Sequence, residues 1–349
     1  MARRSHNLFL SRTLQRSLSS MTRSALRAGT KAVTKAVRAK AGKAPSVSAA
    51  SKAKTQRSSA VVDRPLTGFV IGVAGARRYR LFKPPGVSRH EQLPLLMMLH
   101  GCQQDARALS ASSQMNRAAV RERFMVLYPE QDRMANAHAC WNWYDTRTGR
   151  ADAEASSIDG AITQVCLTQP VDVSRIAVAG LSAGASMAAL LAVRRPERYR
   201  AVAMHSGVAP GVAHSSATAI GAMLGRRIKA APAAPLASGI HLPALLVIQG
   251  SADHVVAPSN GTEAARSWAA IEGAKPGTVR TVQRGARYAM QVTDYRAPGR
   301  LVATLCEVSG LGHAWSGGAA GQSYSDPKGP DASRMIWSFV AKQFATARA

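Results

Sequence analysis

Acidic residues are absent from the first 62 positions of this 349-residue chain, where 14 Lys and Arg residues stand among Ser, Ala and Thr. The same stretch holds a single aromatic residue, Phe9, and therefore offers too little apolar surface to fold alone. It has no uninterrupted apolar run of seven or more residues, which argues against a secretory signal peptide, and no transmembrane run. We therefore expect a basic, disordered extension over residues 1–62 and one folded domain over residues 63–349.

The basic extension has two interpretations. Its residues 24–38 place Lys and Arg at helical spacing opposite Leu26, Val33 and Val37. That pattern is typical of an amphipathic helix that binds an anionic surface, such as a membrane, a nucleic acid or the coat of a polymer granule. We predict no specific nucleic-acid partner. The alternative is a solvated extension, or a misassigned start codon, without a binding role.

Metal-binding patterns are also missing. The four cysteines form no C-x-x-C pair, and no histidine spacing suggests a metal site. We predict neither a metal nor any other cofactor. Cys166 and Cys306 fall in helical and strand patterns, which is typical of buried small hydrophobic residues.

Short apolar segments that alternate with helical patterns predict the fold. Strand patterns occur near residues 66–73, 77–82, 94–99, 124–128, 175–180, 199–204, 243–249 and 302–308. Helical patterns occur at about 107–122, 157–168, 183–196, 259–272 and 331–345. This alternation predicts an α/β domain with a doubly wound, mostly parallel sheet. The Ala-, Gly- and Pro-rich stretch 208–241 is the expected cap or lid insertion.

A nucleophile is predicted within residues 180–184, which read Gly-Leu-Ser-Ala-Gly. This G-x-S-x-G pattern follows an apolar, β-branched run and opens an alanine-rich helical one. A sharp turn from strand to helix lifts a serine hydroxyl above a parallel sheet, and flanking glycines leave the crowded backbone room. Ser182 is therefore the candidate nucleophile. A glycine-rich loop with a serine N-cap is the alternative.

An acid and a base follow Ser182 in the order expected of such a nucleophile. Asp253 comes directly after the strand pattern 243–249, and His313 follows the strand pattern 302–308. His313 would take the proton from the serine hydroxyl, and Asp253 would orient the imidazole. Asp294 and Asp326 are weaker alternatives for the acid, because neither follows a comparable apolar strand. The other histidines near these positions, His205 and His254, are expected to be structural or to line a pocket.

Two backbone N–H groups are predicted to bind an oxyanion. One belongs to Ala183, the residue after the nucleophile, and the other to Cys102, in the loop after the apolar strand that ends at His100-Gly101. Gly101 would shape that turn, and His100 is expected to be structural.

The chain resembles the catalytic domain of the polyhydroxybutyrate (PHB) depolymerase family of serine esterases, which is related to feruloyl and acetylxylan esterases. The matching blocks extend from about residue 79 to residue 344, and one departure is Ala185, where the family more often has glycine. They are His100-Gly-Cys-Gln-Gln104, Met115-Asn116, Val126-Leu-Tyr-Pro-Glu-Gln131, Cys140-Trp-Asn-Trp-Tyr144, Gly180–Gly184 and Gly312-His-Ala-Trp315.

The resemblance implies an α/β-hydrolase fold and a serine esterase that acts on a PHB-type polyester or its oligomers. A feruloyl or acetylxylan esterase is the alternative, and a non-catalytic protein that binds a granule or another anionic surface is the second. The substrate would be a polyester or ester, and the protein would be extracellular, or else cytoplasmic and associated with storage granules.

The resemblance also implies roles for residues near the nucleophile. Trp141, Trp143 and Trp315 would contact the substrate, although buried indoles that anchor a loop are the alternative for the Trp141 block. Cys102 and Cys140 would form a disulfide beside the site.

Overall fold

The computed structural model describes residues 66–72, 75–226 and 240–346. The predicted basic extension, its amphipathic segment 24–38 and its boundary near residue 62 lie outside these residues, as does part of the predicted insertion 208–241. Within the described ranges, no helix combines the length and the apolar character that a membrane crossing needs.

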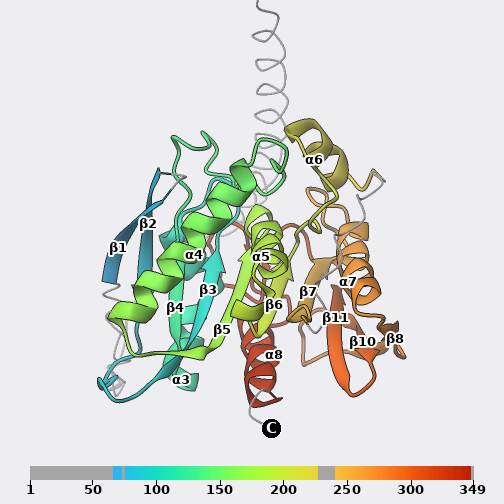
Figure 1. The fold of residues 1–349 in the computed structure, drawn as a ribbon. Coiled ribbons are helices and arrows are strands. Elements are labelled where there is room, and N and C mark those ends of the chain that lie inside the picture. Colours follow the sequence, from blue (N-terminus) through green and yellow to red (C-terminus); the bar gives the residue numbers. More distant parts are fainter. Residues whose placement is uncertain (1–65, 73–74, 227–239, 347–349) are drawn as a thin grey trace, which may run out of the picture. The chain divides into compact units, whose positions relative to one another are not determined.

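A single eleven-stranded sheet forms the centre of the domain (Figure 1). Its order is β1-β2-β4-β3-β5-β6-β7-β11-β10-β8, and β9 pairs with β10. The strands are β1 (Leu66–Gly72), β2 (Gly75–Phe82), β3 (Leu93–Leu99), β4 (Met125–Pro129), β5 (Val171–Leu181), β6 (Ala201–His205), β7 (Ala244–Gly250), β8 (Lys275–Pro276), β9 (Arg280–Val282), β10 (Met290–Ala297) and β11 (Arg300–Val308). The strands from β4 to β11 along this order run parallel. At the two edges the pairings are antiparallel: β1 with β2, β2 with β4, β10 with β11, and β8 and β9 with β10. The predicted doubly wound, mostly parallel sheet is confirmed.

Helices cover both faces of the sheet. They are α2 (Ala106–Ser113), α3 (Met115–Glu122), α4 (Arg150–Thr168), α5 (Ala183–Arg194), α6 (Ser216–Met223), α7 (Ser259–Ile271) and α8 (Ala332–Thr346), with a short 3-10 turn at Pro196–Arg198. The helices α4, α5 and α7 pack on one face, and α2, α3 and α8 pack on the other. The central strands read as continuous apolar runs because they are buried on both faces. On β5, for example, Val178 belongs to one core and Ala179 to the other.

The structure differs from the sequence prediction at three places. The helix predicted over 107–122 is two helices, because Gln114 adopts a left-handed backbone conformation with φ 55°. The helix predicted from residue 157 begins earlier, at Arg150. The antiparallel strands β8 to β10 escape the apolar pattern, because β8 and β9 contain no buried residue and β10 is buried at only three of its eight positions.

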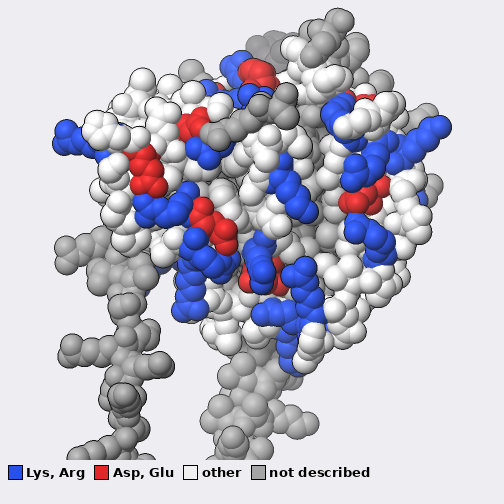
Figure 2. All heavy atoms as spheres, turned by 90° about the horizontal axis from the view of Figure 1, so that it is seen from below, with Lys and Arg blue, Asp and Glu red and all other residues white. Residues whose placement is uncertain are grey.

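Basic side chains outnumber acidic ones on the face seen in Figure 2. Some arginines on the domain are paired, as in Arg175–Asp172 at 2.5 Å and Arg198–Asp159 at 2.8 Å. All four side chains of these two pairs are partly buried. The basic excess of the chain is therefore a property of the folded domain as well as of its first 62 residues.

Candidate active site

Ser182 lies in the sharp turn between β5 and α5. Its backbone, at φ 57° and ψ −122°, is in a region that costs a non-glycine residue roughly 1–3 kcal/mol and persists only where the surroundings hold it. The Ser182 N–H donates to the carbonyl of His205 at 2.9 Å, and the Ser182 carbonyl accepts from the Ala185 N–H at 2.9 Å. The turn is thus tied to the neighbouring strand β6 and to the first turn of α5.

Gly180 and Gly184 are required by the close packing of this turn. A Cβ on Gly180 would lie 2.3 Å from the carbonyl oxygen of Gly184, and a Cβ on Gly184 would lie 2.2 Å from the carbonyl oxygen of Leu99. No side chain fits at such distances. The glycine pattern therefore reflects a direct contact between the turn and the end of β3. Ala185, where the family more often has glycine, is buried in α5.

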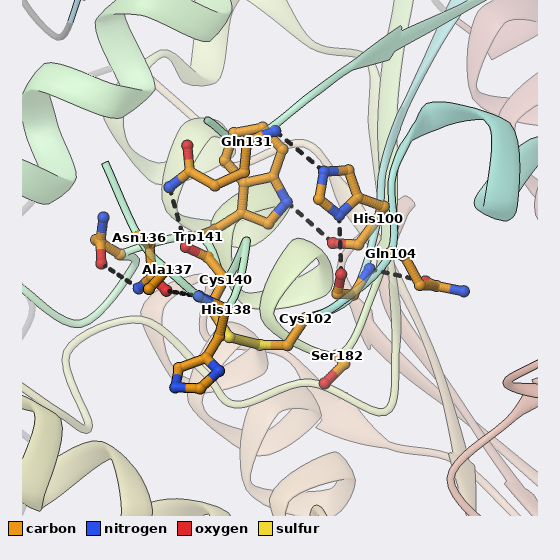
Figure 3. The surroundings of a disulfide bond; sticks show 12 residues. His100, Cys102, Gln104, Gln131, Asn136, Ala137, His138, Cys140, Trp141 and Ser182 are labelled. Carbon is orange, nitrogen blue, oxygen red and sulfur yellow. Dashed lines mark hydrogen bonds between the residues drawn. A yellow bond between two sulfur atoms is a disulfide. The ribbon is translucent and has the colours of Figure 1, made fainter. Parts of the chain in front are cut away.

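The loop after β3 lies against Ser182 (Figure 3). A Cβ on Gly101 would lie 3.5 Å from the Cβ of Ser182, and the Gly101 N–H donates to Oε1 of Gln104 at 3.0 Å. The N–H groups of Cys102 and Ala183, the predicted oxyanion donors, donate to no acceptor among the described residues. The N–H of Ala183 is one of the first four of α5, which have no partner within a helix.

A disulfide joins Cys102 to Cys140, with Cα atoms 4.3 Å apart. In Figure 3 it lies beside Ser182. Trp141, the next residue, donates from its indole nitrogen to the carbonyl of His100 at 2.9 Å. The disulfide and this hydrogen bond fasten the loop after β3 to the segment that carries the tryptophans.

His100 supports the same loop. Its Nε2 accepts from the Gln131 N–H at 3.0 Å, and its Nδ1 lies 2.8 Å from the carbonyl oxygen of Gly101. Burial lowers the pKa of His100 to about 4. The ring is therefore neutral near pH 7, with its proton on Nδ1, and acts as a structural connector, as the sequence suggested.

A buried polar network next to Trp141 is not predicted from the sequence. Glu154 on α4 is buried and accepts from Nε2 of Gln131 at 2.7 Å and from the N–H of Asn142 at 2.9 Å. Arg77 donates to Oε1 of Gln131 at 2.8 Å, and its guanidinium lies 5.0 Å from the centre of the Trp141 ring. Burial lowers the pKa of Arg77. Glu154 lies one helical turn after the buried Ala151, but no local sequence signal distinguishes it from an acidic residue that faces solvent.

Asp253 and His313 come together at the carboxyl ends of β7 and β11. Nδ1 of His313 lies 2.8 Å from Oδ2 of Asp253, and the carboxyl group has no exposed surface. The other carboxylate oxygen accepts from the N–H groups of Val255 and Val256 at 2.9 and 2.8 Å. Burial opposes ionisation of Asp253, but the hydrogen bonds from His313 and the two N–H groups outweigh it, so its pKa is lowered. The pair is an ionised carboxylate that orients an imidazole.

The sequence alternatives for the acid lie elsewhere. Asp294 accepts from Thr304 at 2.7 Å and pairs with Arg280 at 2.8 Å. Asp326 accepts from the N–H of Lys328 at 2.8 Å. Neither carboxylate contacts His313 among the described interactions. His254 is exposed, beside Asp253.

The predicted substrate-binding tryptophans are buried. Trp141 and Trp315 have no exposed surface, and Trp143 is 6% exposed. The indole nitrogen of Trp315 donates to Oγ of Ser333 at 3.1 Å. Trp141 and Trp315 thus each join two segments through the indole nitrogen, and Trp143 packs in the core. Contact of the three rings with a substrate stays a prediction.

The serine and the imidazole are not hydrogen-bonded to each other among the described interactions, and such contacts are often loose without a substrate. Sheet order nevertheless gathers the predicted residues: β5, β6, β7 and β11 are successive neighbours, and His313 is about one-tenth exposed. In the part of the chain that the structure describes, no group of three or more metal-ligating side chains is close enough to hold a metal.

The chain is similar in sequence to known esterases. A family model described as esterase PHB depolymerase matches residues 77–289. The chain is 30% identical over 203 residues to poly(3-hydroxyalkanoate) depolymerase C of Paucimonas lemoignei, over 56% of this chain and 49% of that protein. It is 24% identical over 222 residues to acetylxylan esterase A of Talaromyces purpureogenus, over 60% of this chain and 56% of that protein. The chain thus spans about half the length of these relatives.

Among solved structures, an acetyl xylan esterase from Aspergillus awamori matches with a TM-score of 0.60 and 19% identity, over 71% of this chain and 94% of that one. At this identity the likeness shows the fold. The predicted α/β-hydrolase fold is confirmed.

Proposed function

Because this chain belongs to the esterase PHB depolymerase family, we propose that it is a serine esterase, a carboxylic ester hydrolase that works through an acyl-serine intermediate. The observation that carries the proposal is the buried Asp253–His313 pair at 2.8 Å, which follows β7 and β11 in the same sheet whose strand β5 leads into the strained turn of Ser182. The order of these residues along the chain and their placement on a parallel sheet agree with this chemistry.

Each residue has a role in the proposed reaction. His313 takes the proton from Ser182 as the hydroxyl oxygen attacks the ester carbonyl, and then gives it to the leaving alcohol. Asp253 stays ionised, orients the imidazole and stabilises the imidazolium. The N–H groups of Cys102 and Ala183 bind the oxyanion of the tetrahedral intermediate. Water then takes the place of the alcohol, and the reverse sequence releases the acid.

We propose a PHB-type polyhydroxyalkanoate or its oligomers as the substrate. The higher identity to a poly(3-hydroxyalkanoate) depolymerase supports this choice over an acetylated or feruloylated cell-wall ester. The likeness to acetylxylan esterases in sequence and structure makes that class the second candidate.

The domain boundary and the compartment are further parts of the proposal. We place the catalytic domain in residues 63–349, so removal of residues 1–62 should leave the turnover of a soluble ester unchanged, and a loss would move the boundary. The Cys102–Cys140 disulfide supports an extracellular location, because disulfides persist mainly in oxidising compartments.

Covalent labelling tests the nucleophile. A fluorophosphonate probe should label the protein, Ser182→Ala should abolish the labelling, and Ser309→Ala, which alters an exposed serine, should leave it intact. Undiminished labelling of Ser182→Ala would refute the assignment. Substrate class needs a second measurement: rates on amorphous PHB, on 3-hydroxybutyrate oligomers, on acetylated xylan and on a feruloyl ester, compared side by side. Faster release of acetate or ferulate would favour the second candidate.

A further inference from the structure

His205 is a fully buried histidine to which the proposed reaction gives no part. It ends β6, the strand between β5 and β7, and has 0% exposed surface. A titratable ring so deeply buried needs hydrogen-bond partners. Both ring nitrogens of His205 have such a partner: Nε2 has the Ser316 N–H, and Nδ1 has Oγ of Ser206.

The partners of His205 come from the two halves of the proposed site. Its carbonyl accepts from the N–H of Ser182 at 2.9 Å. Its ring Nε2 accepts from the N–H of Ser316, three residues after His313, at 3.1 Å. One residue thus connects the turn of the nucleophile with the loop of the base.

The ring can make this bond in one protonation state only. Because the Ser316 N–H is a donor, Nε2 must carry a lone pair, so the proton lies on Nδ1, 3.2 Å from Oγ of Ser206. Burial and, to a smaller extent, His313 lower the pKa of this ring, and together they outweigh Asp253, which raises it. Trp315 covers one face of the ring, with centroids 5.2 Å apart and planes 24° from parallel.

We infer that His205 is a positioning residue that sets the separation of Ser182 and His313 by holding both backbone segments. The inference rests on the proposed function and deepens it. Neutrality of the ring matters for the reaction as well, because a positive charge here would oppose the imidazolium that forms on His313. Loss of the Nε2 acceptor would release the loop of the base at Ser316.

Two variants of equal side-chain length test the inference. In His205→Gln, Oε1 can accept from Ser316, whereas His205→Met has no such acceptor. With a soluble ester, His205→Met should lower kcat on the order of 100-fold, the effect of about 1 Å of misplacement, with KM little changed. His205→Gln should stay within a few-fold of the wild type. Tyr199 lies just before β6, on the side away from His205. Tyr199→Phe removes a hydroxyl that contacts Asp159, and it should leave kcat unchanged.

The outcomes separate the inference from the proposed function. Absence of ester turnover in the wild type would refute the function itself. If the wild type is active, unchanged kcat in a folded His205→Met would overturn the positioning role. So would a 100-fold loss in a folded His205→Gln, which remains informative even if the Met variant does not fold. A change confined to KM in either variant would also contradict it.

Discussion

The disulfide between Cys102 and Cys140 should contribute strongly to stability. It closes a loop of 38 residues, for which the loop-entropy relation gives about 13 cal/mol/K, or about 4 kcal/mol at room temperature. The double variant Cys102→Ser, Cys140→Ser should therefore lose about 4 kcal/mol of unfolding free energy as an upper value. Serine is similar in size, so packing changes should add little.

Activity should respond far less than stability. The same two segments are also joined by the hydrogen bond from Gln103 to the carbonyl of His138 at 2.8 Å and by that from Trp141 to His100 at 2.9 Å. The Cys102 N–H is a backbone group and survives substitution. At a temperature where the double variant is folded, we expect its kcat within a few-fold of the wild type.

Urea unfolding followed by tryptophan fluorescence measures the stability change. The wild type in reductant should converge on the double variant, and Cys166→Ser, which alters a free cysteine, should stay close to the untreated wild type. A double variant within about 1 kcal/mol of the wild type would refute the loop-entropy argument. A loss of activity much larger than the loss of folded protein would show that the disulfide positions the oxyanion donor.

Two further predictions concern the packing around the site. Gly184→Ala should lower the free energy of unfolding by about 1–3 kcal/mol and slow probe labelling, because its Cβ would lie 2.2 Å from the Leu99 carbonyl oxygen. Gly312→Ala is the control: its Cβ would have no neighbour nearer than 3.9 Å, so its urea midpoint should match that of the wild type. Equal midpoints for the two variants would contradict this account. Acid should destabilise the protein through His100 and His205, because burial lowers their pKa values from 6.5 to about 4 and about 3. Below pH 6.5 the unfolded chain binds protons at these histidines that the folded protein does not. The free energy of unfolding therefore falls as the pH drops from 6.5 toward 4. As the pH falls across this range, the urea midpoint should fall less steeply for His205→Gln than for the wild type. Parallel curves would show that His205 does not contribute to the acid destabilisation.

The sequence predicts those parts of the site that follow directly from strand ends. Buried parallel strands are continuous apolar runs, so the polar residue after each run marks the carboxyl edge of the sheet. Ser182, Asp253 and His313 each follow such a run, and so does the loop of Cys102. This rule fails for strands β8 to β10, whose exposed sides carry polar residues.

Features that depend on distant partners are not visible in local patterns. Glu154 lies in an alanine-rich helix, where an acidic residue would ordinarily face solvent. Its burial becomes possible only because Gln131 and the backbone of Asn142, from another loop, donate to it. The break at Gln114 is likewise invisible, since glutamine is a good helix former.

The burial of the aromatic residues around the serine has a physical explanation in the two histidines beside it. His100 directly follows β3 and His205 ends β6, and these strands are the two neighbours of β5, which leads to Ser182. Each ring accepts a backbone N–H through Nε2, at 3.0 and 3.1 Å. Such a ring must stay unprotonated at Nε2, and exclusion of water is what keeps it so. Trp141 lies 5.2 Å from the first ring and Trp315 lies 5.2 Å from the second. The burial of the two tryptophans therefore needs no contact with a substrate to explain it, because each ring packs against a buried histidine that must stay neutral.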